Sequence, residues 1–87
     1  MSVTVRAEFP GYVMDILVRP GDLVEEEEAL MLMESTDQDH TPFYVNAPEA
    51  GKIREILLEE GDFADEDDEL MVMADADPDE QDDIQHG

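Results

Sequence analysis

The chain contains an internal repeat with an offset of forty residues. Residues 11–33 align with residues 51–73 without a gap, and nine of the 23 aligned positions are identical. Most of the remaining positions exchange residues of similar chemistry. Self-similarity at a fixed period means that one structural unit occurs more than once along the chain. We therefore predict a fold with two similar halves, residues 11–33 and 51–73.

Short apolar runs that end at Gly, Pro or acidic clusters predict an all-β fold. Their length is typical of strands, and the prolines between them are incompatible with long helices. The predicted strands cover residues 3–9, 12–18, 29–34, 43–47, 52–58 and 70–74, with short strands near 23–24 and 63–64. Each half also has a Gly-Asp pair, at Gly21 and Gly61, which predicts a turn with positive φ.

The most apolar segments, residues 30–33 and 70–73, are predicted to lie in the core. They are apolar on both faces, as in strands enclosed between two layers. They include four of the six Met residues, whose unbranched side chains fill irregular cores. The predicted core residues are Leu17, Leu30, Leu32, Leu57, Leu70 and Val72.

The negative net charge of the chain argues against nucleic acid and anionic membranes as partners. Twenty-six acidic residues stand against four basic ones, a formal charge of −22, so nucleic acid and anionic membranes would repel it. A high-salt cytoplasm and an ordinary acidic protein both remain open as explanations. The chain has no Cys for disulfides or thiolate chemistry, and neither a signal-like N-terminus nor a long apolar segment, which predicts a cytoplasmic protein. We expect one domain over residues 1–74 and a disordered acidic tail over residues 75–87.

Several motifs resemble the biotinyl/lipoyl attachment domain. They are Gly11-x-Val-x-x-Ile-Leu-Val-x-Pro-Gly-Asp, Leu30-x-Leu-x-Glu34, and Val45-x-Ala-Pro-x-x-Gly-x-Ile-x-x-Ile-Leu-x-x-Glu-Gly-Asp62. The resemblance covers about residues 3–74 in the right order. It implies a flattened barrel or sandwich of two four-stranded antiparallel sheets related by a pseudo-twofold axis.

The resemblance also implies an attachment site that this sequence does not complete. In the family, a lysine on the hairpin between the two halves forms an amide with biotin or lipoate. Counting forward from Glu34 in the family's Glu-x-x-Lys pattern places this position at Asp37, whereas counting back from Pro48 places it at His40, with Gln38 between them. No residue of the turn 35–41 is lysine, and the single lysine, Lys52, lies in the second half. We therefore expect no covalently bound cofactor.

Three interpretations of function follow. The first is a non-enzymatic binding or scaffold module that docks, through its hairpin, on a protein partner of the carboxylase or 2-oxoacid dehydrogenase type. The second is a metal-binding or catalytic protein that uses Glu34, Asp37, Asp39 and His40. The third is a subunit or fragment of a larger assembly, such as a transport adaptor. The first leads, because no nucleophile and base pair supports catalysis and the acidic runs match no calcium loop.

The candidate interface residues under the first interpretation are Asp37, Gln38, His40 and Tyr44. Phe43 and Tyr44 are adjacent on a predicted strand and so point to opposite faces. Val45 and Ala47 share a face with Phe43, which predicts that Phe43 is buried and Tyr44 exposed. An exposed aromatic ring beside a polar turn can anchor an interface.

Overall fold

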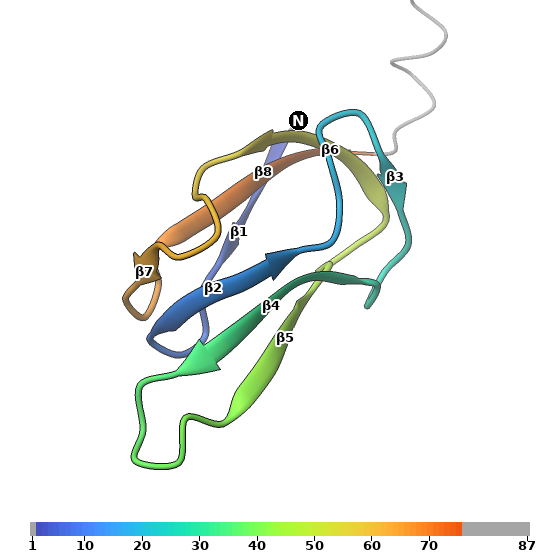
Figure 1. The fold of residues 1–87 in the computed structure, drawn as a ribbon. Coiled ribbons are helices and arrows are strands. Elements are labelled where there is room, and N and C mark those ends of the chain that lie inside the picture. Colours follow the sequence, from blue (N-terminus) through green and yellow to red (C-terminus); the bar gives the residue numbers. More distant parts are fainter. Residues whose placement is uncertain (1, 76–87) are drawn as a thin grey trace, which may run out of the picture.

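A computed structural model describes residues 2–75 as eight β-strands with no helix in that range, and hence none that could cross a membrane (Figure 1). The strands are β1 (Ser2–Arg6), β2 (Gly11–Ile16), β3 (Leu23–Val24), β4 (Ala29–Ser35), β5 (Pro42–Asn46), β6 (Gly51–Ile56), β7 (Phe63–Ala64) and β8 (Glu69–Asp75). All eight predicted strands are present, including both short ones. Of the acidic tail predicted for residues 75–87, residues 76–87 lie outside the described residues, and Asp75 is the last residue of β8.

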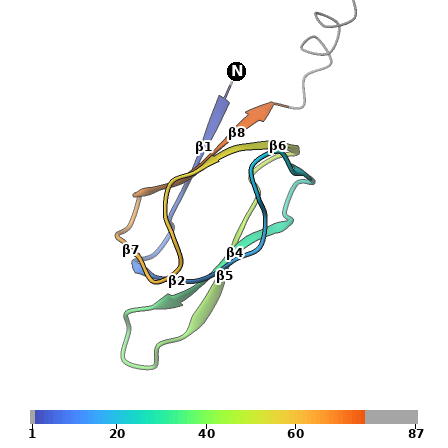
Figure 2. The same ribbon diagram turned by 45° about the horizontal axis from the view of Figure 1, so that its top comes forward.

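The strands form two four-stranded antiparallel sheets, which confirms the predicted fold class. Sheet A has the order β1-β8-β6-β3 and sheet B the order β5-β4-β2-β7. Figure 2 shows them as two layers, with β1, β8 and β6 on one side and β2, β4 and β5 on the other. Divided as β1–β4 and β5–β8, the two parts of the chain each supply two strands to each sheet, so they interlock and neither can complete a sheet alone.

The Gly-Asp turns join the two halves through matching hydrogen bonds. The Gly21 N–H donates to the Ile53 carbonyl oxygen at 2.7 Å, and the Gly61 N–H donates to that of Val13 at 2.8 Å. The two glycines have φ values of 98° and 94°, as predicted for residues without a Cβ. A turn of one half is therefore bonded to a strand of the other, with nearly equal geometry in both directions.

The acidic runs after these turns form a second pair of equivalent turns. The Glu25 N–H donates to Glu28 Oε1 at 2.9 Å, and the Asp65 N–H donates to Asp68 Oδ2 at 2.8 Å. Glu27 and Asp67 have positive φ values of 72° and 71°. These carboxylates close surface turns by accepting hydrogen bonds from backbone N–H groups.

Methionine and leucine side chains from both halves fill the space between the sheets. The largest fully buried side chains are Leu30, Met31, Met33, Ile53, Leu70, Met71 and Met73. The prediction that the repeated Met residues are core residues is therefore confirmed. Burial of consecutive residues at Leu30-Met31 and Leu70-Met71 arises from β-bulges, because Leu30 and Leu70 are skipped in the pairing with the neighbouring strands.

Four of the six predicted core residues are not fully buried. Leu17 and Leu57 are 45% and 36% exposed, and Leu32 and Val72 are half-buried. A bulge in β2 skips Met14 in the pairing with β4, and a bulge in β6 skips Arg54 in the pairing with β8. Each extra residue reverses the in-and-out alternation that follows it, so Val18 faces the core and Leu17 faces outward.

Candidate functional site

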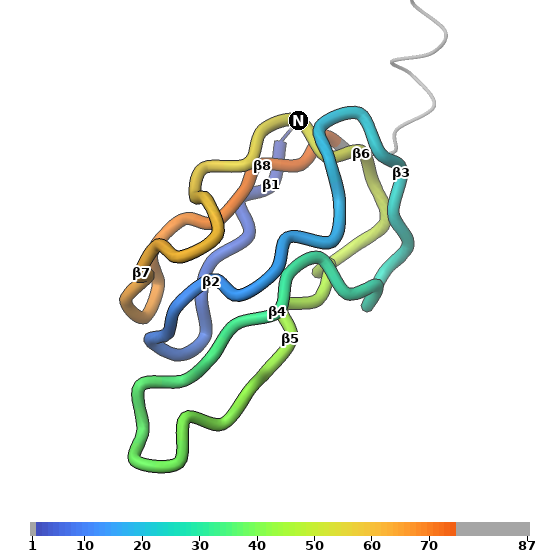
Figure 3. The backbone as a smooth tube through the Cα atoms, in the orientation of Figure 1, coloured from blue at the N-terminus to red at the C-terminus, as the bar shows by residue number. Residues whose placement is uncertain are grey.

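The turn between β4 and β5 links the two halves and extends beyond the rest of the molecule (Figure 3). It is closed by a hydrogen bond of 2.9 Å from the Ser35 N–H to the Thr41 carbonyl oxygen. Residues 36–41 are exposed. This turn is where the resemblance implied the attachment residue, and it lies outside the forty-residue repeat, so the symmetry of the fold does not fix its conformation.

Asp37 organises this turn. Its Oδ1 accepts hydrogen bonds from the N–H groups of Asp39 at 3.1 Å and Thr41 at 3.2 Å. Its own N–H donates to Ser35 Oγ at 3.0 Å, and its carbonyl oxygen accepts from the His40 N–H at 3.1 Å. Asp side chains often stabilise tight turns in this way. The carboxylate at the first predicted attachment position is thus engaged with the turn itself.

The hydrogen bonds to Asp37 also change its acidity. The Thr41 N–H, with smaller contributions from Ser35, His40 and Asp39, holds the pKa of the Asp37 carboxyl below its ordinary value of 3.8, although partial desolvation opposes the change. Hydrogen bonds donated to a carboxylate favour its charged form. Asp37 therefore adds a fixed negative charge to the turn at neutral pH.

The three candidate attachment positions differ in how well each would tolerate a new side chain. His40 has a φ of 53°, in the left-handed region that few non-glycine residues occupy. Gln38 is exposed at the tip, and the hydrogen bonds that close the turn involve Ser35, Asp37, Asp39, His40 and Thr41. Position 38 is therefore the one at which a new side chain leaves these bonds in place.

Tyr44 is exposed, as predicted, whereas Phe43 is half-buried. Tyr44 is 58% exposed on the outer face of sheet B, two residues beyond the start of β5. Phe43 is half-buried against the core, and its ring meets Phe9 edge-on with 5.5 Å between centroids. Tyr44 thus presents an aromatic ring close to the hairpin.

The structure does not support the metal interpretation of the hairpin. Glu34, Asp37, Asp39 and His40 lie on one turn, but Asp37 is directed at backbone N–H groups. Within residues 2–75, no three carboxylate or imidazole side chains are arranged to hold a metal ion, in this turn or in the acidic runs.

Lys52 lies in a different setting from the hairpin. It is an exposed residue within β6 of sheet A, opposite Leu23 on one side and Ala74 on the other. Its amine therefore projects from the face of a sheet, whereas the hairpin leaves sheet B.

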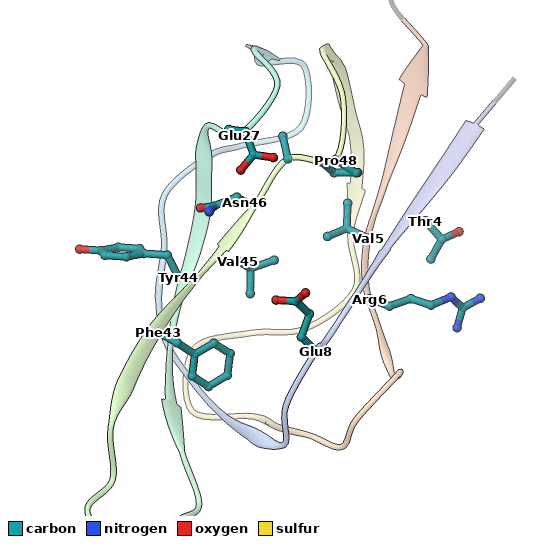
Figure 4. A pocket seen from close by; sticks show the side chains of 11 residues that line it. Thr4, Val5, Arg6, Glu8, Glu27, Phe43, Tyr44, Val45, Asn46 and Pro48 are labelled. Carbon is teal, nitrogen blue, oxygen red and sulfur yellow. The ribbon is translucent and has the colours of Figure 1, made fainter.

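A cleft of about 310 Å³ lies between β1 and β5, the edge strands of the two sheets (Figure 4). Val5 and Val45, which occupy equivalent positions in the two halves, point toward each other across it. Sequence reasoning did not identify this cleft, because it depends on how the two edges meet. Arg6 points away from it, toward the Asp67 carbonyl oxygen and the Glu69 carboxylate. The cleft thus brings the apolar side chains of Val5 and Val45 near the carboxylates of Glu8 and Glu27.

Comparisons with known proteins identify relatives of this fold. The Biotin_lipoyl family, described as "Biotin-requiring enzyme", matches residues 1–73. The lipoyl domain of the 2-oxoglutarate dehydrogenase complex from Azotobacter vinelandii is 26% identical, with a TM-score of 0.64 over 78% of this chain and 82% of that domain. No sequence among the curated proteins matches the chain.

Two carboxylase structures share the fold at lower identity. Urea carboxylase from Kluyveromyces lactis is 24% identical with a TM-score of 0.77, over 85% of this chain and 6% of that protein. A single-chain, multi-domain long-chain acyl-CoA carboxylase is 19% identical with a TM-score of 0.77, over 98% of this chain and 8% of that protein. The chain therefore spans only 6% and 8% of the length of these two proteins and shares its fold with that part of each.

Proposed function

We propose that this chain, which belongs to the biotin/lipoyl attachment family, is a protein-binding module that carries no cofactor on its hairpin. The relatives named above are parts of carboxylases and of a 2-oxoacid dehydrogenase complex. We place the partner of this chain in the same class of biotin- or lipoate-dependent enzyme systems. On this proposal the hairpin and the surface beside it are retained for docking.

The observation that carries the proposal is the chemistry of the turn 35–41. A stable amide to biotin or lipoate requires a primary amine, and this turn offers carboxylates, hydroxyls, an amide and an imidazole. At the first candidate position, Asp37 replaces an outward-pointing amine with a carboxylate that accepts hydrogen bonds from two backbone N–H groups. The turn is therefore stabilised by the residue that stands where the family's lysine is expected.

The position of Lys52 supports the same conclusion. A carrier lysine must reach a ligase and then move its cofactor between active sites, which favours a protruding turn. Lys52 instead lies within β6, with strands paired on both sides of it. Its amine is exposed, but the backbone around it has no freedom to swing.

Mass spectrometry of the intact protein tests the proposal. The chain would be co-expressed with a biotin ligase and, separately, with a lipoate ligase, and we expect the unmodified mass in both cases. A mass increment of either cofactor on the wild-type chain, at Lys52 or elsewhere, would disprove the proposal.

A gain-of-function variant tests whether the turn lacks only a primary amine and is otherwise still presented to a ligase. We expect Gln38→Lys to be modified more readily than Asp37→Lys or His40→Lys, because it preserves the hydrogen bonds of the turn and avoids the left-handed residue. Gln38→Arg is the matched control, since it adds a positive charge without a primary amine. Modification of Gln38→Lys alone would show that the turn is still presented to a ligase.

The adaptor interpretation receives no specific support. Such adaptors carry a helical hairpin at the turn between the two halves. Here the turn between β4 and β5 closes within a few residues and contains no helix. The small share of the two carboxylases that the chain matches is compatible with a subunit or a piece of a larger protein.

A further inference from the structure

The outer face of sheet B carries a group of exposed or half-buried apolar side chains, which we call the aromatic face. Its members come from all four strands of the sheet: Tyr12 and Met14 on β2, Leu32 on β4, Tyr44 on β5 and Phe63 on β7. Leu32 is opposite Tyr44, and Tyr12 is opposite Phe63. The rings of Tyr12 and Phe63 lie 5.3 Å apart. Apart from Leu32, which is half-buried, each member is between 47% and 58% exposed.

The other half of the molecule provides an internal control for this face. Forty residues away, the equivalent positions on the outer face of sheet A are occupied by Thr4, Leu23, Lys52, Arg54 and Val72. Lys52 is opposite Leu23 in sheet A just as Tyr12 is opposite Phe63 in sheet B. The same backbone is thus built without aromatic residues at these sites, and three of the five are polar or charged. Folding alone does not require aromatic rings there, and an exposed apolar patch usually marks an interaction site.

The charges around the aromatic face all have one sign. Glu34 lies opposite Tyr12, and Asp15 lies opposite Leu32. Asp62 precedes Phe63 in the chain. The four strands of sheet B contain no Lys or Arg, whereas Arg6, Lys52 and Arg54 are on strands of sheet A and Arg19 is in the turn before β3. The face therefore combines an apolar centre with an acidic rim.

We propose that the aromatic face docks a partner protein whose contact surface has an aliphatic centre surrounded by Lys and Arg side chains. The apolar centre would bury Tyr12, Leu32 and Tyr44, while the cations would meet the acidic rim and the ring faces. The charge of −22 would also speed the approach of such a partner. A second copy of this chain fits less well, because pairing two aromatic faces would bring the acidic rims together.

This inference deepens the proposed function, since it rests on the chain acting as a binding module. Its test is separate, because the absence of a bound cofactor is read by mass and the docking face is read by binding. Failure of one experiment therefore leaves the other result interpretable.

Nuclear magnetic resonance titration with a defined probe tests the docking face. The probe is a synthetic peptide of alternating lysine and leucine, and the control is a lysine and serine peptide of equal charge and length. With the lysine and leucine peptide we expect the largest amide shifts on β2, β4 and β5 around Tyr12, Leu32 and Tyr44, whereas the control peptide should bind more weakly. Largest shifts at the acidic turns 25–28 and 65–68 with both peptides would overturn the proposal, because they would indicate charge attraction alone.

Charge-neutral variants make the test specific. The double variant Tyr12→Ser with Tyr44→Thr should raise the Kd for the lysine and leucine peptide by about tenfold or more. The matched control is Leu23→Ser, which removes an exposed apolar side chain from sheet A and should change the Kd by less than about twofold. Unchanged binding by the double variant would disprove the proposal.

Two further measurements distinguish loss of peptide binding from unfolding of the variant and from self-association of the chain. The single variant Tyr44→Thr copies the residue at the equivalent position, Thr4, so this half of the fold should tolerate it if the double variant unfolds. Light scattering would follow the mass of the wild-type chain with concentration. Self-association that Tyr44→Thr abolishes would assign the face to a second copy and overturn the proposal of a basic partner.

Discussion

The two halves of this molecule are nearly the same inside and different outside. Leu30, Met31 and Met33 in the first half are matched by Leu70, Met71 and Met73 in the second, and all six are fully buried. On the outer faces, Tyr12 and Met14 correspond to Lys52 and Arg54. Positions that the fold requires are therefore repeated, and positions that it leaves free have diverged. The departures from symmetry, namely the aromatic face and the turn 35–41, are where we locate the function.

The largest expected effect tests whether the two halves contribute equally to the core. Leu30→Ala and Leu70→Ala should each lower the free energy of unfolding by about 2 to 5 kcal/mol, because each leaves a cavity among fully buried side chains. Leu17→Ala and Leu57→Ala are the controls, and should cost less than about 1 kcal/mol because these side chains face outward. Urea unfolding measures all four. A small loss for only one of Leu30 and Leu70 would show that the halves pack unequally.

The next effect tests the paired turns. Gly21→Ala and Gly61→Ala should each destabilise the protein by roughly 1 to 2 kcal/mol, because alanine is strained at positive φ. A Cβ added at either position meets no atom within 4 Å, so the cost comes from the backbone alone. Equal losses in thermal unfolding would confirm that the turns are equivalent, whereas a loss at only one would break the comparison.

Much of the fold could be predicted from the sequence because the repeat is visible in it. The strands and the Gly-Asp turns depend on local residue types, and both predictions are confirmed. The prediction for Leu17 and Leu57 was wrong because β-bulges at Met14 and Arg54 reverse the alternation of the strand. A bulge depends on pairing with another strand, which no local pattern records.

The site was predicted less completely. The turn 35–41 and the exposure of Tyr44 were anticipated, since both depend on sequence position and strand alternation. The role of Asp37 in closing the turn was not, because it depends on the turn's conformation. One member of the aromatic face could have been found by comparing Tyr12 with Lys52 across the repeat, but grouping its members on one face required the strand order of sheet B.

A smaller effect concerns the salt dependence of the melting temperature, because both halves concentrate acidic residues in equivalent turns. Raising NaCl from low to molar concentration should raise the melting temperature, because salt screens repulsion among carboxylates at a net charge of −22. The variants Glu26→Gln with Glu27→Gln, and Glu66→Gln with Asp67→Asn, should each reduce this salt dependence by a similar amount. A melting temperature that does not change with salt in the wild-type chain would contradict the prediction.

The smallest expected effect concerns Asp37, which has no counterpart in the described part of the second half. Its pKa is lowered in the folded chain, so its charged form stabilises the folded turn. That stabilisation is fully present above the ordinary pKa of 3.8 and is lost as the pH falls through the lower folded value. Carboxyl titration followed by nuclear magnetic resonance should therefore show a midpoint for Asp37 below 3.8. Ser35→Ala, which removes a side-chain hydrogen bond to the carboxyl, and Thr41→Pro, which removes the backbone N–H that donates to it, should both raise the midpoint. Asp37→Asn, which keeps an acceptor oxygen without the charge, should slightly lower the free energy of unfolding above pH 5, where the charged form stabilises the turn, and should increase amide exchange at Asp39 and Thr41. A midpoint at or above 3.8 would mean that the turn is not held by this carboxylate, and the difference between the hairpin and the repeated turns would then lie in sequence alone.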